Sequence, residues 1–334
     1  MLTSTSERGI EMAQSQCAEA PRVMTLDRAQ SAGRMATLRV HPTGRAMARS
    51  RSSANGAAGT DAIDFSELAP AVSHGALLGY QMLQVAGREP LLYRPLGRLL
   101  DVAKQSGMLT GVTTNGLVVC PATVKVLAGR CDVVTLSVST PGTEFSAVLS
   151  ELGRRVAMLT EAGLLVNLEV TLTGYNVGDL GTVVSWANEQ GIRSIRLQPR
   201  KVSSTTFQQV MAEQTGSGIA LDVDALMPLR LQEHSQWFLG PDDLETLSLA
   251  RIIDPLLILA DGAVVPLAAD LDDRYRLGSL RDGALTTLAR RWRQEGATRL
   301  AQLRRETYRM CMHPSVPAFA SWTEELTRRS KLAS

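Results

Sequence analysis

"QMLQVAGREPLLYRPLGRLLDVAKQSGMLTGVTTNG", residues 81–116, is the stretch that decides the fold. It predicts a strand over 81–87, a helix over 95–107 that Gly107 ends, and a second strand that begins at 109 and finishes in a polar turn. A strand, a helix and a second strand in this order are typical of a parallel sheet with right-handed crossovers.

The same alternation continues on both sides of this stretch. Further strands are predicted over 35–42, 132–139, 164–173 and 192–200, and further helices over 65–80, 121–130, 145–163 and 177–191. About six strand–helix units therefore precede residue 202, too few for a closed eight-stranded barrel. The sequence predicts an α/β protein whose parallel sheet is open or curled into a partial (β/α)6 barrel.

The C-terminal third has a different pattern. Residues 202–250 are less regular and are expected to cover one end of the sheet. Two apolar runs around Asp261-Gly262 then predict a β-hairpin, and two helices with basic faces follow over 284–296 and 297–310. The predicted domains are a mobile tail (1–34), the partial barrel (35–225) and a small hairpin-plus-helix extension (226–334).

Charge and hydropathy limit the partners. The 334 residues carry a net charge of +2, which gives no global field for nucleic acid. No apolar run approaches the roughly 18 residues of a membrane span. The first 20 residues lack the basic-then-apolar order of a signal peptide. We therefore expect a cytoplasmic protein with neither nucleic acid nor membrane as a partner.

The four cysteines are Cys17, Cys120, Cys131 and Cys311, and they form no C-x-x-C pair. In a reducing compartment they are expected to be free thiols. The apolar surroundings of Cys120 and Cys131 predict that both are small core residues. No metal site is predicted from the cysteines and histidines.

Four stretches follow one another at the first four predicted strands: "LRVHPTGRAMARSRSS", "VAGREPLL", "VTTNG" and "VTLSVST". In this order they resemble the motifs of the radical S-adenosylmethionine (SAM) superfamily. In that family a first strand leads into a C-x-x-x-C-x-x-C loop, the second ends in G-G-E-P, the third in T-N-G, and the fourth contains a serine. The hairpin "LADGAVVPLAADLDDRYRLGSL" is similar to the C-terminal extension of SPASM/Twitch members, which often modify peptides.

This resemblance implies a degenerate member of the family. The three cluster-binding cysteine positions fall on Ala46, Ser50 and Ser53. Alanine offers no ligand, and a serine hydroxyl is a hard donor that releases its proton far less readily than a thiol. The extension has Pro266-Leu267 where a cluster-bearing version has a cysteine. A [4Fe–4S] cluster is therefore not expected.

The resemblance also implies a vestigial SAM pocket. Its residues would be Gly87, Arg88, Glu89, Pro90, Asn115 and Ser137. Arg88 replaces the second glycine of G-G-E-P, and Ser139 stands where the fourth strand of the family has an acidic residue. Arg88 is expected to fork onto Glu89 and fill the pocket; its other role would be to bind a carboxylate or phosphate. Whether the chain binds SAM as a cofactor stays open, and no other cofactor is assigned.

Three functions follow from the resemblance, and whether the chain is an enzyme stays open among them. The first is a pseudoenzyme that binds a peptide or an active radical SAM relative. The alternative is an enzyme of non-radical chemistry that uses SAM or another anion, with Glu89, Asn115, Glu169 and Asn176 at the strand ends. The third is an active enzyme with an unorthodox cluster, which the missing cysteine ligands make the least favoured of the three. No catalytic residue is assigned, and His41 is expected to be a structural strand-end residue.

Overall fold

The computed structural model describes residues 35–44, 62–139, 145–200, 202, 204–214, 216–223, 239–311 and 322–332. The predicted tail (1–34) and the degenerate cluster positions Ala46, Ser50 and Ser53 lie outside these residues. They remain predictions from the sequence.

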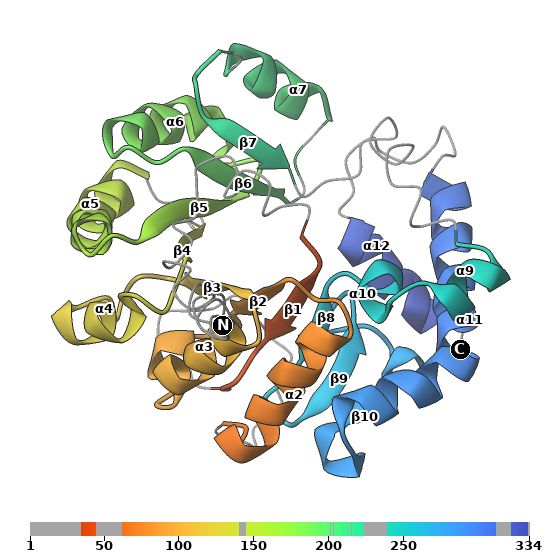
Figure 1. The fold of residues 1–334 in the computed structure, drawn as a ribbon. Helices are drawn as coiled ribbons and strands as arrows, with labels where there is room; N and C mark the ends of the chain where they lie inside the picture. The colour runs from red at the N-terminus through yellow and green to blue at the C-terminus, as the bar shows by residue number, and fades with distance from the viewer. Residues whose placement is uncertain are drawn as a thin grey trace, which may run out of the picture.

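Within the described residues a ten-stranded sheet forms the centre of the fold, in the order β10-β9-β8-β1-β2-β3-β4-β5-β6-β7. Strands β1 to β7 are parallel to their neighbours and follow one another in chain order. Figure 1 shows these strands curling into an arc. Their bounds are β1 Thr37–Val40, β2 Met82–Val85, β3 Leu109–Thr114, β4 Val133–Ser139, β5 Leu165–Leu172, β6 Ser194–Pro199 and β7 Ala220–Val223. The predicted α/β partial barrel is confirmed.

Each of the first six strands is followed by a helix, and these helices lie outside the arc (Figure 1). They are α2 Phe65–Leu77, α3 Leu96–Gln105, α4 Pro121–Leu127, α5 Phe145–Glu161, α6 Leu180–Glu189 and α7 Ser204–Glu213. The short helices are η2 Pro90–Leu92, η3 Val177–Asp179, η5 Asp273–Tyr275, η6 Leu280–Asp282, α9 Pro241–Thr246 and α10 Leu249–Ile252. Six strand–helix units match the prediction, and β7 is an additional strand in the region expected to be irregular.

The predicted hairpin is present and belongs to the same sheet. β8 (Leu256–Ile258) and β9 (Ala263–Pro266) are antiparallel, and β10 (Gly278–Ser279) pairs with β9. On its other side β8 is parallel to β1, with Leu38 opposite Leu256. The hairpin thus extends the wall of the barrel, while the domain boundary at 225/226 remains a prediction.

The two helices predicted after the hairpin are one continuous helix, α11 (Leu285–Cys311). The prediction took Gly296 as a helix end. Gly296 instead lies inside the helix, where a Cβ would overlap the indole of Trp292 one turn earlier. The indole is buried, and its Nε1 donates to the carbonyl oxygen of Tyr275 at 3.0 Å. The glycine therefore makes room for a side chain and does not end the helix. The last described helix is α12 (Trp322–Leu332).

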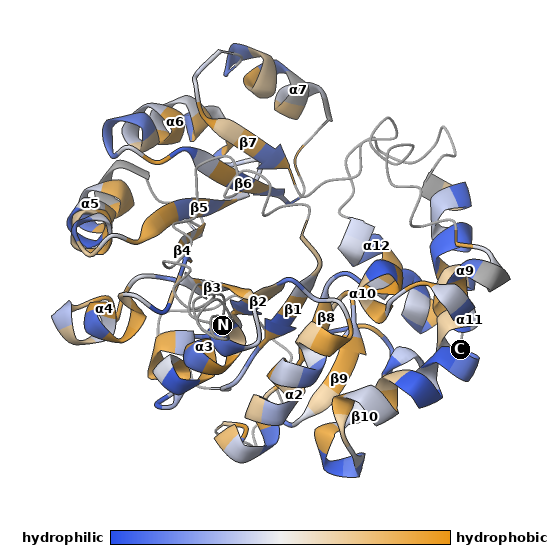
Figure 2. Ribbon diagram, viewed as in Figure 1, coloured by the Kyte–Doolittle hydropathy of each residue, from blue (hydrophilic) through white to orange (hydrophobic). Residues whose placement is uncertain are grey.

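Apolar and polar residues alternate along most of β4, β5 and β6, so these strands have one apolar and one polar face. Leu38 of β1 packs against α2, where it lies over Gly75, so the face with Leu38 and Val40 is the outer, helix-covered one. Since neighbouring residues on a strand point to opposite faces, Arg39 points to the inner face. Figure 2 shows the resulting mixture of hydrophilic and hydrophobic residues along the strands.

Within the described ranges, no helix combines the length and the apolar character needed to cross a bilayer.

Candidate functional site

The G-R-E-P turn follows β2 at the carboxyl edge of the sheet. Gly87 has a φ of +106°, a backbone conformation that glycine adopts readily and other residues rarely. A Cβ at this position would also lie 3.1 Å from Cβ and Cγ of His41, which follows β1. Both the backbone angle and the contact with His41 therefore require glycine here.

Glu89 is a completely buried carboxylate that ties the second strand to the third. Thr114 Oγ1 lies 2.8 Å from one carboxylate oxygen of Glu89 and 3.0 Å from the other. The backbone N–H of Leu91 donates to the same carboxylate at 3.1 Å, and that of Asn115 at 3.4 Å. Burial raises the pKa of Glu89, whereas these hydrogen bonds act in the opposite direction. We call this arrangement the Glu89 clasp.

The fork from Arg88 to Glu89 remains a prediction. Among the described residues, the carboxylate of Glu89 accepts hydrogen bonds from Thr114, Leu91 and Asn115. The side chain of Glu89 caps η2 and meets Thr114 of β3, so three neutral donors surround its oxygens.

The T-N-G turn and Ser137 lie beside the clasp. Asn115 Oδ1 accepts from the N–H of Leu117 at 2.8 Å, so its side chain caps the turn. Thr114 is opposite Leu136 in the β3–β4 register, and Asn115 and Ser137 are the next residues on the two chains. Residues 87–90, Asn115 and Ser137 thus lie on three neighbouring strand ends, as the predicted pocket requires.

A row of polar residues crosses the inner face from β4 to β7. Ser137 is opposite Glu169, Glu169 opposite Arg196, and Arg196 opposite Asp222. Arg196 Nε lies 3.3 Å from Asp222 Oδ2, so this pair forms an ion pair at the β7 side of the row. We call these four residues the cross-strand row. It brings both charge signs to the inner face of the barrel.

Asn176, one of the residues proposed to line a site of non-radical chemistry, lies at a strand end as predicted, but its side chain is engaged by the backbone. It is buried in the turn after β5, where its Oδ1 accepts from the N–H of Thr173 at 2.7 Å and its Nδ2 donates to the carbonyl of Thr171 at 3.1 Å. Both ends of the amide are used to hold the turn. Asn176 is therefore a structural residue, whereas Glu169 faces the interior. The sequence had no signal that separates the two.

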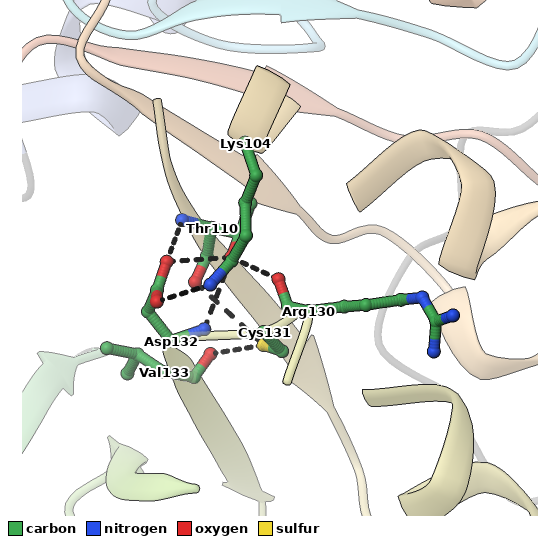
Figure 3. Close-up of polar contacts among 6 residues, drawn as sticks. All are labelled: Lys104, Thr110, Arg130, Cys131, Asp132 and Val133. Atoms are coloured by element: carbon green, nitrogen blue, oxygen red, sulfur yellow. Dashed lines mark hydrogen bonds and ion pairs between the residues drawn. The ribbon is translucent and has the colours of Figure 1, made fainter. Parts of the chain in front are cut away.

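The two cysteines with described side chains lie at opposite edges of the sheet. Cys120 comes between β3 and α4 and is exposed, which corrects the prediction that it is a core residue. Cys131 comes after α4, at the amino end of β4, and is buried as predicted. Figure 3 shows it in a network with Lys104, Thr110 and Asp132. Its thiol donates to the carbonyl of Val133 at 3.2 Å, and burial raises its pKa to about 12.

No group of three or more His, Cys, Asp and Glu side chains in the described ranges is placed to hold a metal ion.

His41 packs at the junction of the first strand and the G-R-E-P turn. Its backbone N–H donates to the carbonyl of Ile258 on β8 at 2.8 Å, and its side chain contacts the position of Gly87. Burial, followed by the charge of Arg39, lowers the pKa of His41 to about 4. The imidazole is therefore neutral at physiological pH.

The lowered pKa makes stability depend on pH. In the unfolded chain His41 binds a proton below about pH 6.5, while the folded protein binds it only near pH 4. The contribution of His41 to stability is fully present above its pKa in the unfolded chain, and it is lost as the pH falls towards its pKa in the folded protein. Between pH 7 and pH 5 this group should lower the free energy of unfolding by about 2 kcal/mol. Urea titrations at both pH values measure this change in the free energy of unfolding. In His41→Gln the change should be smaller by about the same amount. An equal change in the native protein and the variant would contradict the assignment of this pH dependence to His41.

Three solved structures show what this fold resembles. The fold is similar to that of Streptococcus suis SuiB bound to S-adenosylmethionine (TM-score 0.52, 13% identity, 71% of this chain and 60% of that one). SuiB bound to its precursor peptide SuiA gives a TM-score of 0.53 at 13% identity over 70% of this chain and 59% of that one. The anSMEcpe protein with bound AdoMet and the Kp18Cys peptide gives 0.58 at 14% identity over 89% and 97%.

The chain spans about 60% of the length of SuiB. No protein-family model and no curated protein sequence match it. The fold of this chain is thus similar to that of SuiB and anSMEcpe, both of which are described with bound S-adenosylmethionine. Identities of this size show the fold alone.

Proposed function

We propose that this chain is a pseudoenzyme with a radical SAM-like fold that binds a peptide in its partial barrel. The observation that carries the proposal is the inner face of the sheet. The polar residues Thr113, Thr135, Ser137, Asn167, Glu169, Thr171, Arg196 and Gln198 lie there, and all are partly accessible. In closed (β/α)8 barrels these inner positions are packed with branched apolar side chains.

A polar, accessible inner face suits a ligand with polar groups along its whole length. An extended peptide is such a ligand, because each residue offers an N–H and a C=O that need partners when water is removed. The bound peptides of SuiB and anSMEcpe, which share the fold, support this choice. An active radical SAM relative is the other partner that the sequence suggests.

The donors present do not fit a [4Fe–4S] cluster. Such a cluster needs three thiolates close together, and the loop positions that correspond to its ligands are Ala46, Ser50 and Ser53. Cys120 and Cys131 cannot replace them, since α4 separates them and Cys131 is buried at the far edge of the sheet. We therefore assign no reaction step to a cluster.

The residues at the vestigial pocket also fit SAM poorly. In the family the glutamate of G-G-E-P helps to receive the methionine ammonium of SAM. Here the Glu89 clasp occupies that carboxylate with Thr114 and two backbone N–H groups. Arg88 adds a cation, and two positive charges about 4 Å apart repel by about 1 kcal/mol in water and about 4 kcal/mol near a protein surface.

Anaerobic reconstitution tests the loss of the cluster. After incubation with iron, sulfide and reductant, the native chain should contain no stoichiometric iron and show no iron–sulfur absorbance, because three thiolates cannot converge. The triple variant Ala46→Cys, Ser50→Cys, Ser53→Cys should bind iron if the loop keeps the geometry of the family. A radical SAM enzyme reconstituted in the same batch is the positive control. A stoichiometric [4Fe–4S] spectrum from the native chain would overturn the pseudoenzyme assignment.

A further inference from the structure

Glu169 is a partly buried carboxylate on the inner face for which the described residues offer no hydrogen bond or ion pair. It lies between Ser137 and Arg196 in the cross-strand row. The neighbouring guanidinium of Arg196 is directed to the other side, where it pairs with Asp222 at 3.3 Å. A carboxylate that is partly removed from water gains most from a cationic or hydrogen-bonding partner. None of the described residues supplies such a partner to Glu169.

The strand that carries Glu169 leads into a rigid turn with an exposed tyrosine. Tyr175 is 92% exposed, whereas the adjacent Asn176 is only 2% exposed. The side-chain hydrogen bonds of Asn176 to Thr173 and Thr171, together with the bond from the N–H of Tyr175 to Thr173 Oγ1 at 3.3 Å, fix the backbone on both sides. A tyrosine on a fixed backbone loses little conformational entropy when it binds a partner.

Glu169 lies within β5, and Tyr175 lies in the turn that follows this strand. The strand ends at Leu172, three residues beyond Glu169, which places Glu169 roughly 10 Å below the carboxyl edge at about 3.3 Å per residue. A peptide backbone that lies on the rim at Tyr175 can reach Glu169 only with a long side chain. Lysine and arginine have long flexible stems with a cationic end, and these stems pack well along other side chains.

We propose that Glu169 is a specificity-determining residue of the peptide site and receives a basic side chain of the bound peptide, whose backbone contacts Tyr175 at the rim. This inference rests on the proposed function. It adds to that function the class of side chain that the barrel selects. Within the cross-strand row, Arg196 and Asp222 neutralise each other, so Glu169 supplies the unbalanced charge.

Two matched peptide pools test the inference. In both, hexapeptides have randomised positions around one fixed residue, which is lysine in the first pool and its neutral analogue norleucine in the second. Each pool is passed over the immobilised full-length protein, and mass spectrometry measures what is retained. We expect about tenfold greater retention of the lysine pool, since a charge-assisted hydrogen bond has this effect. The difference should shrink at high ionic strength.

Variants locate the effect. Glu169→Gln keeps the size of the side chain and removes its charge, so it should abolish the preference for lysine. Glu161→Gln, at the exposed end of α5, is the control and should leave it unchanged. Tyr175→Ala should lower the retention of both pools by a similar factor, because its contact is with the backbone of the peptide.

The outcomes separate the two proposals. Equal retention of the two pools by the native protein would overturn the role of Glu169 and leave peptide binding in place. Retention of neither pool would overturn the peptide-binding function itself, and the inference with it. The comparison of pools on the native protein decides both points even if Glu169→Gln fails to fold.

Discussion

Replacement of Thr114 by valine should lower the free energy of unfolding by about 3 kcal/mol, because a buried charged group loses its closest donor. Thr114 is itself buried, and its hydroxyl lies within 3.0 Å of both oxygens of the completely buried Glu89. The same hydroxyl accepts from the N–H of Gly116 at 3.1 Å. Valine has nearly the same shape, so the loss reports the polar contacts and not a cavity. Chemical denaturation followed by circular dichroism measures it.

The matched control is Thr135→Val on the neighbouring strand. Thr135 lies on the inner face, is partly accessible, and has no hydrogen bond from its side chain to a described residue. The same substitution there should change stability by no more than about 0.5 kcal/mol. Equal losses at Thr114 and Thr135 would mean that the Glu89 clasp contributes nothing to stability.

Gly296→Ala should destabilise the protein by about 2 kcal/mol, although alanine favours an isolated helix over glycine by about 1 kcal/mol. The added Cβ would overlap the indole of Trp292, which is 5% exposed and bonded to the carbonyl of Tyr275. The indole has to move, and it gives up both its packing and that hydrogen bond. Thermal or urea unfolding measures the change.

Gly153→Ala is the matched substitution in a helix without this contact. Gly153 lies inside α5, and a Cβ there would approach no described atom closer than 3.7 Å, at Oε1 of Gln190. The gain in helix propensity should then appear as a stabilisation of up to about 1 kcal/mol. If both variants were stabilised, the indole of Trp292 would not lie over Gly296 in solution.

Periodicity predicted the sheet well because its signal is local. The apolar alternation that ends at Gly107 and resumes at Leu109 was enough to place α3 and β3. Gly296 shows the limit of such reasoning: a glycine that ends a helix and one that accommodates an indole look the same in the sequence. The outcome depends on Tyr275, which is 21 residues away and accepts the bond from Trp292.

The site was predicted less completely than the sheet. The motifs brought residues 87–90, Asn115 and Ser137 to one edge, as their strand-end positions require. They did not reveal that Thr114 donates a hydrogen bond to Glu89, or that Cys120 is exposed. Such details depend on side-chain direction and on contacts between strands, and neither is encoded in the spacing of a motif.

The pairing of β8 with β1 can form only late in the synthesis of the chain. β1 has neighbours on both sides, and one of them, β8, is made only after more than two hundred further residues, as the contact between Thr37 and Asp254 illustrates. Until β8 (Leu256–Ile258) is made, β1 of the nascent chain has an unpaired edge, a surface on which other chains can assemble. The hairpin of β8 and β9 covers this edge, so we expect a fragment that ends before residue 256 to aggregate more readily than a chain that includes β8.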